Sequence, residues 1–448
     1  MAGKKAKQLT LEEKLQNALV PKEEQPYKIP NNWCWTRLNI LTDLFTGNSI
    51  NAKLKESKYM NLSKGYNYIA TKDINYNSTI NYNNGVKIPF ENSFKIAKKG
   101  SSLLCIEGGS AGRKIGLLNQ DVCFVNKLCA LYPKKIEDKY LFYFLQSPIF
   151  IVKFKEQMNG LIGGVSTSKL KDIPIALTSL AEQQRIVKRI ESLFAKIDRA
   201  KDLIENTLAQ VEQNKMAILH KAFTGELTAK WRKENNIDLS SWKEYELKEV
   251  FKVVKDKYNP QTENQIVNYI GLENIETSKG IISKNNSSEV KSIKTKFKKD
   301  DVLYGKLRPY LNKHDVVNFD GICSTDILVF RFNDINTAKY INYYFNLPMF
   351  IQYAVENSSG INLPRVSEKT ISKYKISLPT IKEQQEIVNI LDKLLAKYNK
   401  IQNLNKQLEQ IELLKKSILA KAFRGELGTN DPQEESAEKL LAEILAEN

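Results

Sequence analysis

The sequence is poor in the residues that most often carry metal, redox or nucleophilic chemistry. It contains two histidines, His220 and His314, which lie far apart in the chain. Its five cysteines are an odd number and none forms a CxxC pair, which argues against a disulfide framework and against a structural zinc site. A catalytic or metal site built on histidine is therefore disfavoured in this protein.

Long apolar segments are also missing. No apolar run approaches the roughly 18 residues that a membrane-spanning helix needs. The first residues, MAGKKAKQLTLEEKL, lack the apolar core of a signal peptide. These absences predict a cytoplasmic protein that makes no contact with a membrane.

Short catalytic motifs are absent as well. An amino-methyltransferase needs a turn such as Asn-Pro-Pro-Tyr, and the nearest stretch, Asn259-Pro260-Gln261, lacks the second proline. The glycine-rich stretch EGGSAGRKIG at 107–116 departs from the phosphate-binding pattern GxxxxGK[ST], because Ile115 follows Lys114. Nuclease sites built from acidic pairs stay open at this point, since such pairs form in space rather than in sequence.

The excess charge is positive and unevenly spread. The chain carries a net charge of +17, while residues 429–448 hold six acids and one lysine, so the rest of the chain carries +22. A globular body with that charge attracts polyanions, nucleic acid first. A general lysine bias of the source proteome would give the same composition, so charge alone leaves both interpretations open.

Four segments recur in the same order, about 200 residues apart. AEQQRIV at 181–187 returns as KEQQEIV at 382–388, and HKAFTGEL at 220–227 returns as AKAFRGEL at 420–427. Upstream, KYLFYFLQSPIFI at 139–151 returns as KYINYYFNLPMFI, and NYIATKDI at 67–74 returns as NYIGLENI. The same comparison matches Cys123 with Cys323. The chain is therefore an internal repeat of a variable region followed by a similar region.

The similar regions predict two long helices. Apolar residues follow steps of four and three from Ile186 to Ile218 and again from Ile387 to Ile418, which is a heptad seam that packs helix on helix. The second seam is one residue shorter, which should overwind the pairing locally. Capping boxes predict where the helices begin, and Gly225 and Gly425 predict where they end. A dimerising coiled coil is the alternative, but two matched seams in one chain favour pairing within the chain.

These patterns predict an α+β protein with a pseudo-twofold internal repeat. Two mixed α/β domains are joined by two long antiparallel coiled-coil helices. If the helices run antiparallel, the two chain ends should meet near one of the globular domains. The predicted parts are a lead-in with a short helix at 1–34, a first variable domain at 35–178, a long helix at 179–225, a linker at 226–240, a second variable domain at 241–379, a second long helix at 380–425 and an acidic tail helix at 426–448.

Two loops combine cations with groups that suit DNA. In the first domain, Ser110, Arg113 and Lys114 follow a glycine-rich turn, which suits a phosphate or a base edge. Arginine can hold guanine, and asparagine adenine, with two parallel hydrogen bonds. The second domain has a richer cluster, made of Lys306, Arg308, Tyr310, Asn312 and Lys313. A merely basic loop at a strand end is the plain alternative for each.

The order and duplication of these segments resemble a known family, the specificity subunits of Type I restriction-modification systems. DVLYGKLRPYLNK, GICSTDILVFRF and LPRVS resemble that family's target-recognition domains, as do SLLCIEGGSAGRKIG and CFVNK in the first copy. ALVPKEEQPYKIPNNWCW resembles its N-terminal lead-in. The resemblance covers nearly the whole chain, and Arg365, in LPRVS, joins the candidate DNA-binding residues through it.

The resemblance implies a non-catalytic subunit that recognises a bipartite, asymmetric site in double-stranded DNA. It implies two methyltransferase subunits and two restriction subunits as partners. This chain would hold no cofactor or metal, and S-adenosylmethionine, ATP and Mg²⁺ would bind to those partners. The residues that the resemblance assigns to partner docking are Glu182, Gln183, Gln184, Ala222, Phe223 and Glu226, and in the second copy Glu383, Gln384, Gln385, Ala422, Phe423 and Glu426.

Two other classes compete with this interpretation. An autonomous DNA methyltransferase or nuclease is opposed by the missing motifs, and methylation by the purified chain would revive it. A structural coiled-coil protein without a DNA function is opposed by the +22 body and the two globular regions. The absence of any duplex-specific gel shift would favour that second class.

Overall fold

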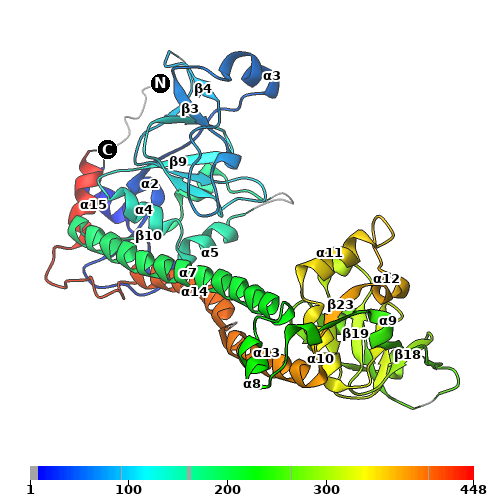
Figure 1. The fold of residues 1–448 in the computed structure, drawn as a ribbon. Helices are drawn as coiled ribbons and strands as arrows, with labels where there is room; N and C mark the ends of the chain where they lie inside the picture. Colours follow the sequence, from blue (N-terminus) through cyan, green and yellow to red (C-terminus); the bar gives the residue numbers. More distant parts are fainter. Residues whose placement is uncertain (1–8, 92, 159–162, 264, 402, 448) are drawn as a thin grey trace. The chain divides into compact units, whose positions relative to one another are not determined.

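The computed structural model describes residues 9–91, 93–158, 163–263, 265–401 and 403–447 (Figure 1). The chain divides into two compact units. Unit 1 comprises Met1–Asp202 and Gln407–Asn448, and unit 2 comprises Leu203–Lys406. Each unit therefore contains one variable region and a segment of both long helical regions.

Two four-stranded sheets form the body of unit 1. The first has the order β2-β9-β6-β7 (Thr42–Thr46, Leu128–Pro133, Ser102–Cys105, Ile115–Leu117), and all its neighbours are antiparallel. The second has the order β4-β3-β8-β5 (Lys87–Ile88, Tyr66–Ile69, Val122–Phe124, Ile96–Ala97), with β3 and β8 parallel. Apolar side chains from both sheets, including Leu103, Val122 and Phe124, form one buried cluster. Burying that shared face removes apolar surface from water and holds the sheets together.

Short helices and one strand pair complete unit 1. They are α2 (Leu38–Leu41), α3 (Ala52–Leu54), α4 (Asp138–Phe144), α5 (Pro148–Glu156), α6 (Thr167–Lys171), and the antiparallel pair of β1 (Cys34–Arg37) with β10 (Pro174–Leu177). Pro148 stands in the first turn of α5, where a missing N–H costs nothing. Strand β10 leads directly into the long helix.

Unit 2 repeats this plan. One sheet has the order β12-β22-β19-β20 (Lys252–Val253, Ile327–Arg331, Val302–Gly305, His314–Val316). The other has the order β13-β18-β21-β14-β17 (Lys257–Tyr258, Lys294–Phe297, Gly321–Cys323, Asn268–Ile270, Asn285–Asn286), and β14 and β21 are parallel. The remaining elements are α8 (Ala229–Glu234), α9 (Leu247–Val250), α10 (Ile335–Tyr344), α11 (Pro348–Glu356), α12 (Glu368–Ser372), the β15–β16 hairpin (Ile275–Glu276, Gly280–Ile281) and the pair of β11 (Lys243–Glu246) with β23 (Lys375–Leu378).

The strand register corrects one detail of the sequence comparison. In the parallel pairs, Asn67 lies opposite Val122 and Asn268 lies opposite Gly321, so Phe124, not Cys123, is the structural equivalent of Cys323. The two cysteines are one position apart because the sequence match was drawn on residue type. Cys323 and Phe124 both fill the core, where size and apolarity matter more than identity.

The first long helix is α7 (Leu180–Phe223), a continuous helix of 44 residues. The second helical region comprises α13 (Ile381–Ile401) and α14 (Asn403–Ala422), on either side of residue 402, which is outside the described residues. In unit 1, α14 runs antiparallel to the first part of α7, with the Lys415 Nζ atom 2.6 Å from an Asp198 carboxylate oxygen. In unit 2, α13 runs antiparallel to the last part of α7, where Ala222 shares a core with Ile387. Gly225 and Gly425 have φ values of 83° and 74°, as the predicted helix ends require.

The first and last helices that the structure describes meet within unit 1. Helix α1 (Leu11–Ala18), which begins with a capping box at Thr10, contacts α15 (Ala437–Ala446). The amide of Ala437 donates a 2.9 Å hydrogen bond to the carbonyl of Asn32. This confirms the prediction that the lead-in and the tail close on one globular domain. Within the described ranges, none of the helices combines the length and the apolarity that crossing a bilayer requires.

Candidate nucleic-acid interface

The β6–β7 loop, residues 106–114, gathers the candidate DNA-binding residues of unit 1. The ring of Tyr76 lies beside it, with the Arg113 guanidinium carbon 5.0 Å and the Lys114 Nζ 5.2 Å from the ring centroid. The Tyr76 hydroxyl lies 3.4 Å from the Ser110 Oγ. Cations over an aromatic face attract its π electrons, so the ring orders both side chains. The structure therefore brings Ser110, Arg113 and Lys114 together.

Tyr76 itself was not among the predicted residues. It stands at the start of the stretch 76–84, which is rich in asparagine and has no apolar periodicity. Its side chain is 60% exposed although it contacts two cations. An exposed aromatic face between cations is suited to contact with a nucleic acid.

Glycines shape the β6–β7 loop in two different ways. A Cβ atom added at Gly108 or Gly109 would meet nothing within 4 Å, so there is open space beside the main chain on that side of the loop. Gly112 has a φ of 69°, and a Cβ at that position would stand 2.7 Å from the Phe154 ring. Only glycine, which has no Cβ atom, allows both the left-handed backbone and the close approach of the Phe154 ring at position 112. The loop is therefore packed on one side and accessible on the other.

The β19–β20 loop, residues 306–313, is the equivalent of that loop in unit 2. Arg308 and Asn312 both have left-handed backbones, with φ values of 52° and 42°. Main-chain hydrogen bonds of 2.9 Å, from Leu311 to Arg308 and from Asn312 to Pro309, close the turn between them. A left-handed conformation costs a residue with a Cβ about 1–2 kcal/mol, which these bonds offset. The turn leaves the side chains of Arg308 and Tyr310 exposed.

Arg365 lies beside this loop although it is more than 50 residues away in sequence. The Arg308 amide donates a 2.7 Å hydrogen bond to the Pro364 carbonyl, and the Val366 amide donates a 3.0 Å bond to Lys306. The Arg365 Nε donates to an Asp326 carboxylate oxygen at 3.1 Å. The structure thus brings Lys306, Arg308, Tyr310 and Arg365 to one surface of unit 2.

Two predicted lysines have an internal partner. Lys114 Nζ donates to the Thr71 carbonyl at 3.1 Å, and Lys313 Nζ donates to the Leu272 carbonyl at 2.7 Å. The two bonds are equivalent in the repeat, since each joins the end of the cationic loop to a 3₁₀ turn after the parallel strand. In each unit this lysine holds the shape of the loop while its charge adds to the local positive potential.

Asn312 also faces inward. Its side chain is 7% exposed, and its amide nitrogen donates to the Phe345 carbonyl at 3.0 Å and lies 3.1 Å from His314 Nε2. Burial lowers the pKa of His314, so the ring is neutral, and its Nδ1 lies 2.7 Å from the Asn342 Oδ1. The neutral ring then donates from Nδ1 and accepts at Nε2. Asn312 therefore positions the loop from below, while the exposed positions are Arg308 and Tyr310.

The glutamates that begin the long helices are buried in hydrogen-bond clusters. Glu182 is 0% exposed and accepts hydrogen bonds from Trp33 (2.8 Å), Thr178 (2.8 Å) and Asn430 (3.0 Å). The predicted Ser179 cap is present, with its Oγ 3.2 Å from the Glu182 amide. The glutamate carboxylate, however, binds these distant groups, so it serves tertiary structure as well as the start of the helix.

Glu383 occupies the same position in unit 2. It is 0% exposed and accepts hydrogen bonds from Thr228 (2.7 Å) and Trp242 (3.0 Å). Its further partner is a cation, because Arg232 Nη1 lies 2.5 Å from the carboxylate. In each unit, a tryptophan near the start of the variable region and residues that follow a long helix meet on the same glutamate.

Burial divides the twelve predicted docking residues into three groups. Seven are buried within this chain and cannot contact a partner while it is folded: Glu182, Gln183, Ala222, Glu383, Gln384, Ala422 and Phe423. Phe223 is partly buried and packs on Tyr340 and Tyr344. The exposed members are Gln184, Glu226, Gln385 and Glu426.

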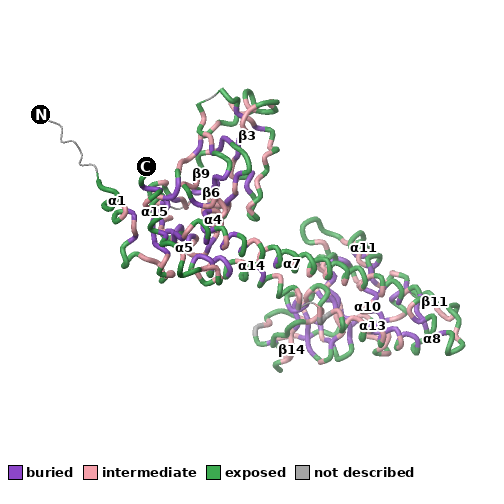
Figure 2. Tube along the Cα trace, turned by 90° about the vertical axis from the view of Figure 1, so that its left-hand side faces the viewer, coloured by how far each residue is buried: buried purple, intermediate pink, exposed green. Residues whose placement is uncertain are grey.

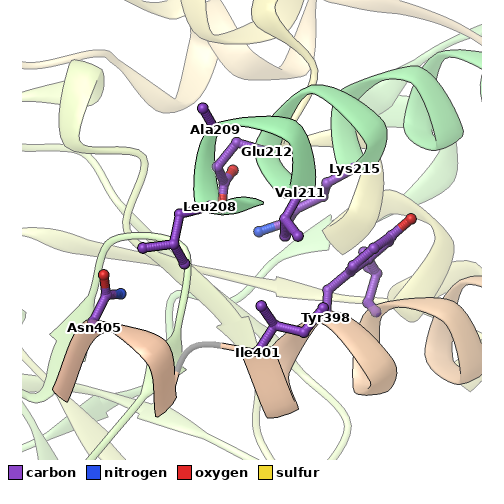
Figure 3. A pocket seen from close by; sticks show the side chains of 9 residues that line it. Leu208, Ala209, Val211, Glu212, Lys215, Tyr398, Ile401 and Asn405 are labelled. Carbon is purple, nitrogen blue, oxygen red and sulfur yellow. The ribbon is translucent and has the colours of Figure 1, made fainter. Parts of the chain in front are cut away.

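The helix pair of unit 2 is incompletely packed near its middle. Val211 and Lys215 of α7 face Tyr398 and Ile401 of α13 across a hollow of about 340 Å³ (Figure 3). Val211, Tyr398 and Ile401 are seam positions, yet each stays partly exposed. Figure 2 shows that α7 is mainly exposed along its middle. In the part of the chain that the structure describes, no three metal-ligating side chains gather at a common point.

Comparison with known proteins agrees with this duplicated plan. The family model for the Type I restriction modification DNA specificity domain matches twice, at residues 31–213 and 240–413. The EcoDI specificity subunit of Escherichia coli is 29% identical over 348 residues, which cover 70% of this chain and 78% of that protein. The StySPI specificity subunit of Salmonella potsdam is 26% identical over 362 residues, 72% of this chain and 75% of that protein.

Solved structures share the fold. A chain from a study of complex assembly and conformational transition of the type I R-M system has a TM-score of 0.68 at 18% identity, and covers 90% of this chain and 100% of itself. The HsdS subunit from Thermoanaerobacter tengcongensis has a TM-score of 0.58 at 19% identity, over 90% of this chain and 99% of itself. The two matched domains, the paired long helices and the named relatives together show that the chain belongs to the family of Type I restriction-modification DNA specificity subunits, a non-catalytic family whose task is recognition of the DNA target.

Proposed function

We propose that this specificity subunit recognises a bipartite, asymmetric target in double-stranded DNA, one half-site per variable region. The observation that carries the proposal is the equivalence of the β6–β7 and β19–β20 loops. Both project from the same sheet position and both expose cations, yet their side chains differ. Different side chains on the same framework should recognise different half-sites, since base edges are distinguished by side-chain hydrogen bonds.

We assign the DNA contacts to the candidate side chains that are exposed to solvent. Arg113 beside Tyr76 in unit 1, and Arg308 with Tyr310 and Arg365 in unit 2, are the side chains placed to reach a duplex. Ser110 and Lys306 are partly buried at the edges of these groups. Lys114, Asn312 and Lys313 support the loops through the internal bonds described above. Arginine paired with guanine is the contact that such loops would use most readily.

The same chain would scaffold the other subunits of the system. We assign docking of two methyltransferase subunits to the exposed positions at the ends of the long helices, Gln184, Glu226, Gln385 and Glu426. Two restriction subunits would join the resulting complex. S-adenosylmethionine, ATP and Mg²⁺ would bind those partners, because the motifs for such chemistry are missing from this sequence.

Replacing Arg308 by alanine in a complex reconstituted with the methyltransferase subunits tests the proposal. A bidentate contact contributes about 1–3 kcal/mol, so affinity for cognate DNA should fall roughly 5- to 150-fold. Methylation mapping should show relaxed specificity in one half-site only. Lys230→Ala on α8, whose side chain is 90% exposed, is the matched loss of charge and should leave both half-sites unchanged. Unchanged affinity and specificity in a folded Arg308→Ala complex would contradict the assignment.

A further inference from the structure

A short loop of unit 2, residues 359–365, presents an isoleucine entirely to solvent. Ser359 and Arg365 close the loop with reciprocal main-chain hydrogen bonds of 2.9 and 2.8 Å. Gly360 follows with a φ of 99°, a conformation that suits glycine. Ile361 is then 100% exposed, while Leu363 is 45% exposed. The isoleucine stands on a closed turn of defined backbone.

The base of this loop is bonded to the β19–β20 loop. The 2.7 Å bond from the Arg308 amide to the Pro364 carbonyl joins the two loops directly, and Leu307 and Arg365 form an isolated β-bridge. The Arg365 guanidinium is bonded to Asp326 and lies 3.4 Å from the Leu363 carbonyl. The Ile361 turn is therefore held beside the cations that face DNA in the proposed function.

The chemistry around the turn favours DNA as its partner. A single exposed apolar residue is ordinary on a protein surface, and alone it would need no explanation. Here Arg308 and Arg365 flank the turn, so a polyanion is the complementary partner. A protein partner of stable kind would instead need a broad surface of about 20–30 residues. One projecting aliphatic side chain matches the apolar part of a base edge, such as a thymine methyl group.

We propose that Ile361 is an apolar DNA contact that determines specificity in the half-site recognised by unit 2. The proposal rests on the proposed function. Arg308 and Arg365 attract the duplex and fix its register, and Ile361 buries its side chain against a base edge that they do not reach. Removing an aliphatic side chain from such a contact should weaken binding about tenfold or more.

The test compares Ile361→Ala with Ile361→Leu in the reconstituted complex. Binding to cognate duplex is measured between 50 and 200 mM salt. Ile361→Ala should weaken binding about tenfold with an unchanged slope of log Kd against log salt, because no ion is released by an apolar contact. Ile361→Leu should restore most of the affinity. Arg308→Ala, which removes the proposed bidentate base contact, should weaken binding roughly 5- to 150-fold and relax specificity at a different base.

A matched control is Leu239→Ala, since Leu239 is also exposed (46%) but lies in the short turn Leu239–Ser241 after α8. It should bind like the wild type. Ile361→Ala binding within twofold of the wild type would overturn this inference, as would normal DNA binding combined with impaired subunit assembly. A wild-type complex that fails to distinguish cognate from unrelated duplex would instead refute the proposed function.

Discussion

Replacing Arg232 by methionine should loosen the start of helix α13. Arg232 donates to the Glu383 carboxylate at 2.5 Å and to the Gly225 carbonyl at 2.6 Å, with side-chain exposures of 9% for Arg232 and 0% for Glu383. Methionine keeps the volume but removes the charge, so the carboxylate stays buried with only Thr228 and Trp242 as donors. Breaking a buried pair in this way costs about 3–5 kcal/mol.

Hydrogen exchange followed by mass spectrometry measures this cost locally, which suits a chain of two units that need not unfold together. Because 1.4 kcal/mol is a factor of ten, amides in the first turns of α13 should exchange about 10²–10⁴-fold faster, up to the limit set by unfolding of the whole unit. Peptides around Glu182 supply the internal reference for the exchange rates. The donors to Glu182 are the neutral residues Trp33, Thr178 and Asn430, so its hydrogen bonds do not depend on Arg232.

Two further variants separate charge from packing. Arg185→Met removes a more exposed pair with Glu434, whose side chains are 39% and 22% exposed, and should cost about 1 kcal/mol or less. Arg232→Met combined with Glu383→Gln removes both charges and should recover much of the loss. An Arg232→Met protein whose α13 amides exchange at the wild-type rate would refute the reasoning.

Three other predictions concern recognition, pH and length. Tyr76→Ala should release Arg113 and weaken binding severalfold at the unit 1 half-site alone, as measured by methylation mapping and gel shift. Because burial lowers the pKa of His314, the unfolded chain takes up a proton near pH 6.5 before the folded one does. The free energy of unfolding of unit 2 should therefore fall as the pH drops below about 6.5, by up to about 1.4 kcal/mol per pH unit. Urea titrations followed by hydrogen exchange measure this dependence, and His314→Gln should abolish it. Adding one heptad to both long helical regions should widen the unread gap of the target by up to ~3 bp without changing either half-site; an unchanged gap in an active complex would show that the helices do not set it.

Much of the architecture could be predicted because the same pattern occurs twice in the sequence. The repeated segments and the heptad steps from Ile186 and from Ile387 depend on burial of apolar side chains, which is a periodic signal. The helix ends were equally predictable, since a left-handed backbone after a helix favours glycine, and Gly225 and Gly425 both have positive φ values. The core of each unit follows from the same alternation of apolar residues in short strands.

The parts that escaped prediction depend on contacts between distant residues. Glu182 and Glu383 lie in a polar motif that is typical of a surface, and only the fold places tryptophans and Arg232 around them. Tyr76 and Arg113 meet because two loops from different strands adjoin. Asn312 has the right chemistry for adenine, but its left-handed backbone turns the amide toward His314. The composition and spacing of the residues do not show in which direction these side chains point.

The manner in which the β19–β20 loop is supported bears on how new specificities arise. Its shape depends on main-chain bonds from Arg308 to Pro364 and from Val366 to Lys306, and on one lysine beneath it. The exposed side chains of Arg308 and Tyr310 have no part in those bonds. In the proposed function, substitutions at these positions would therefore alter the recognised sequence while the loop keeps its conformation. The same reasoning predicts that single substitutions of these two residues change the DNA target of this loop without unfolding the subunit.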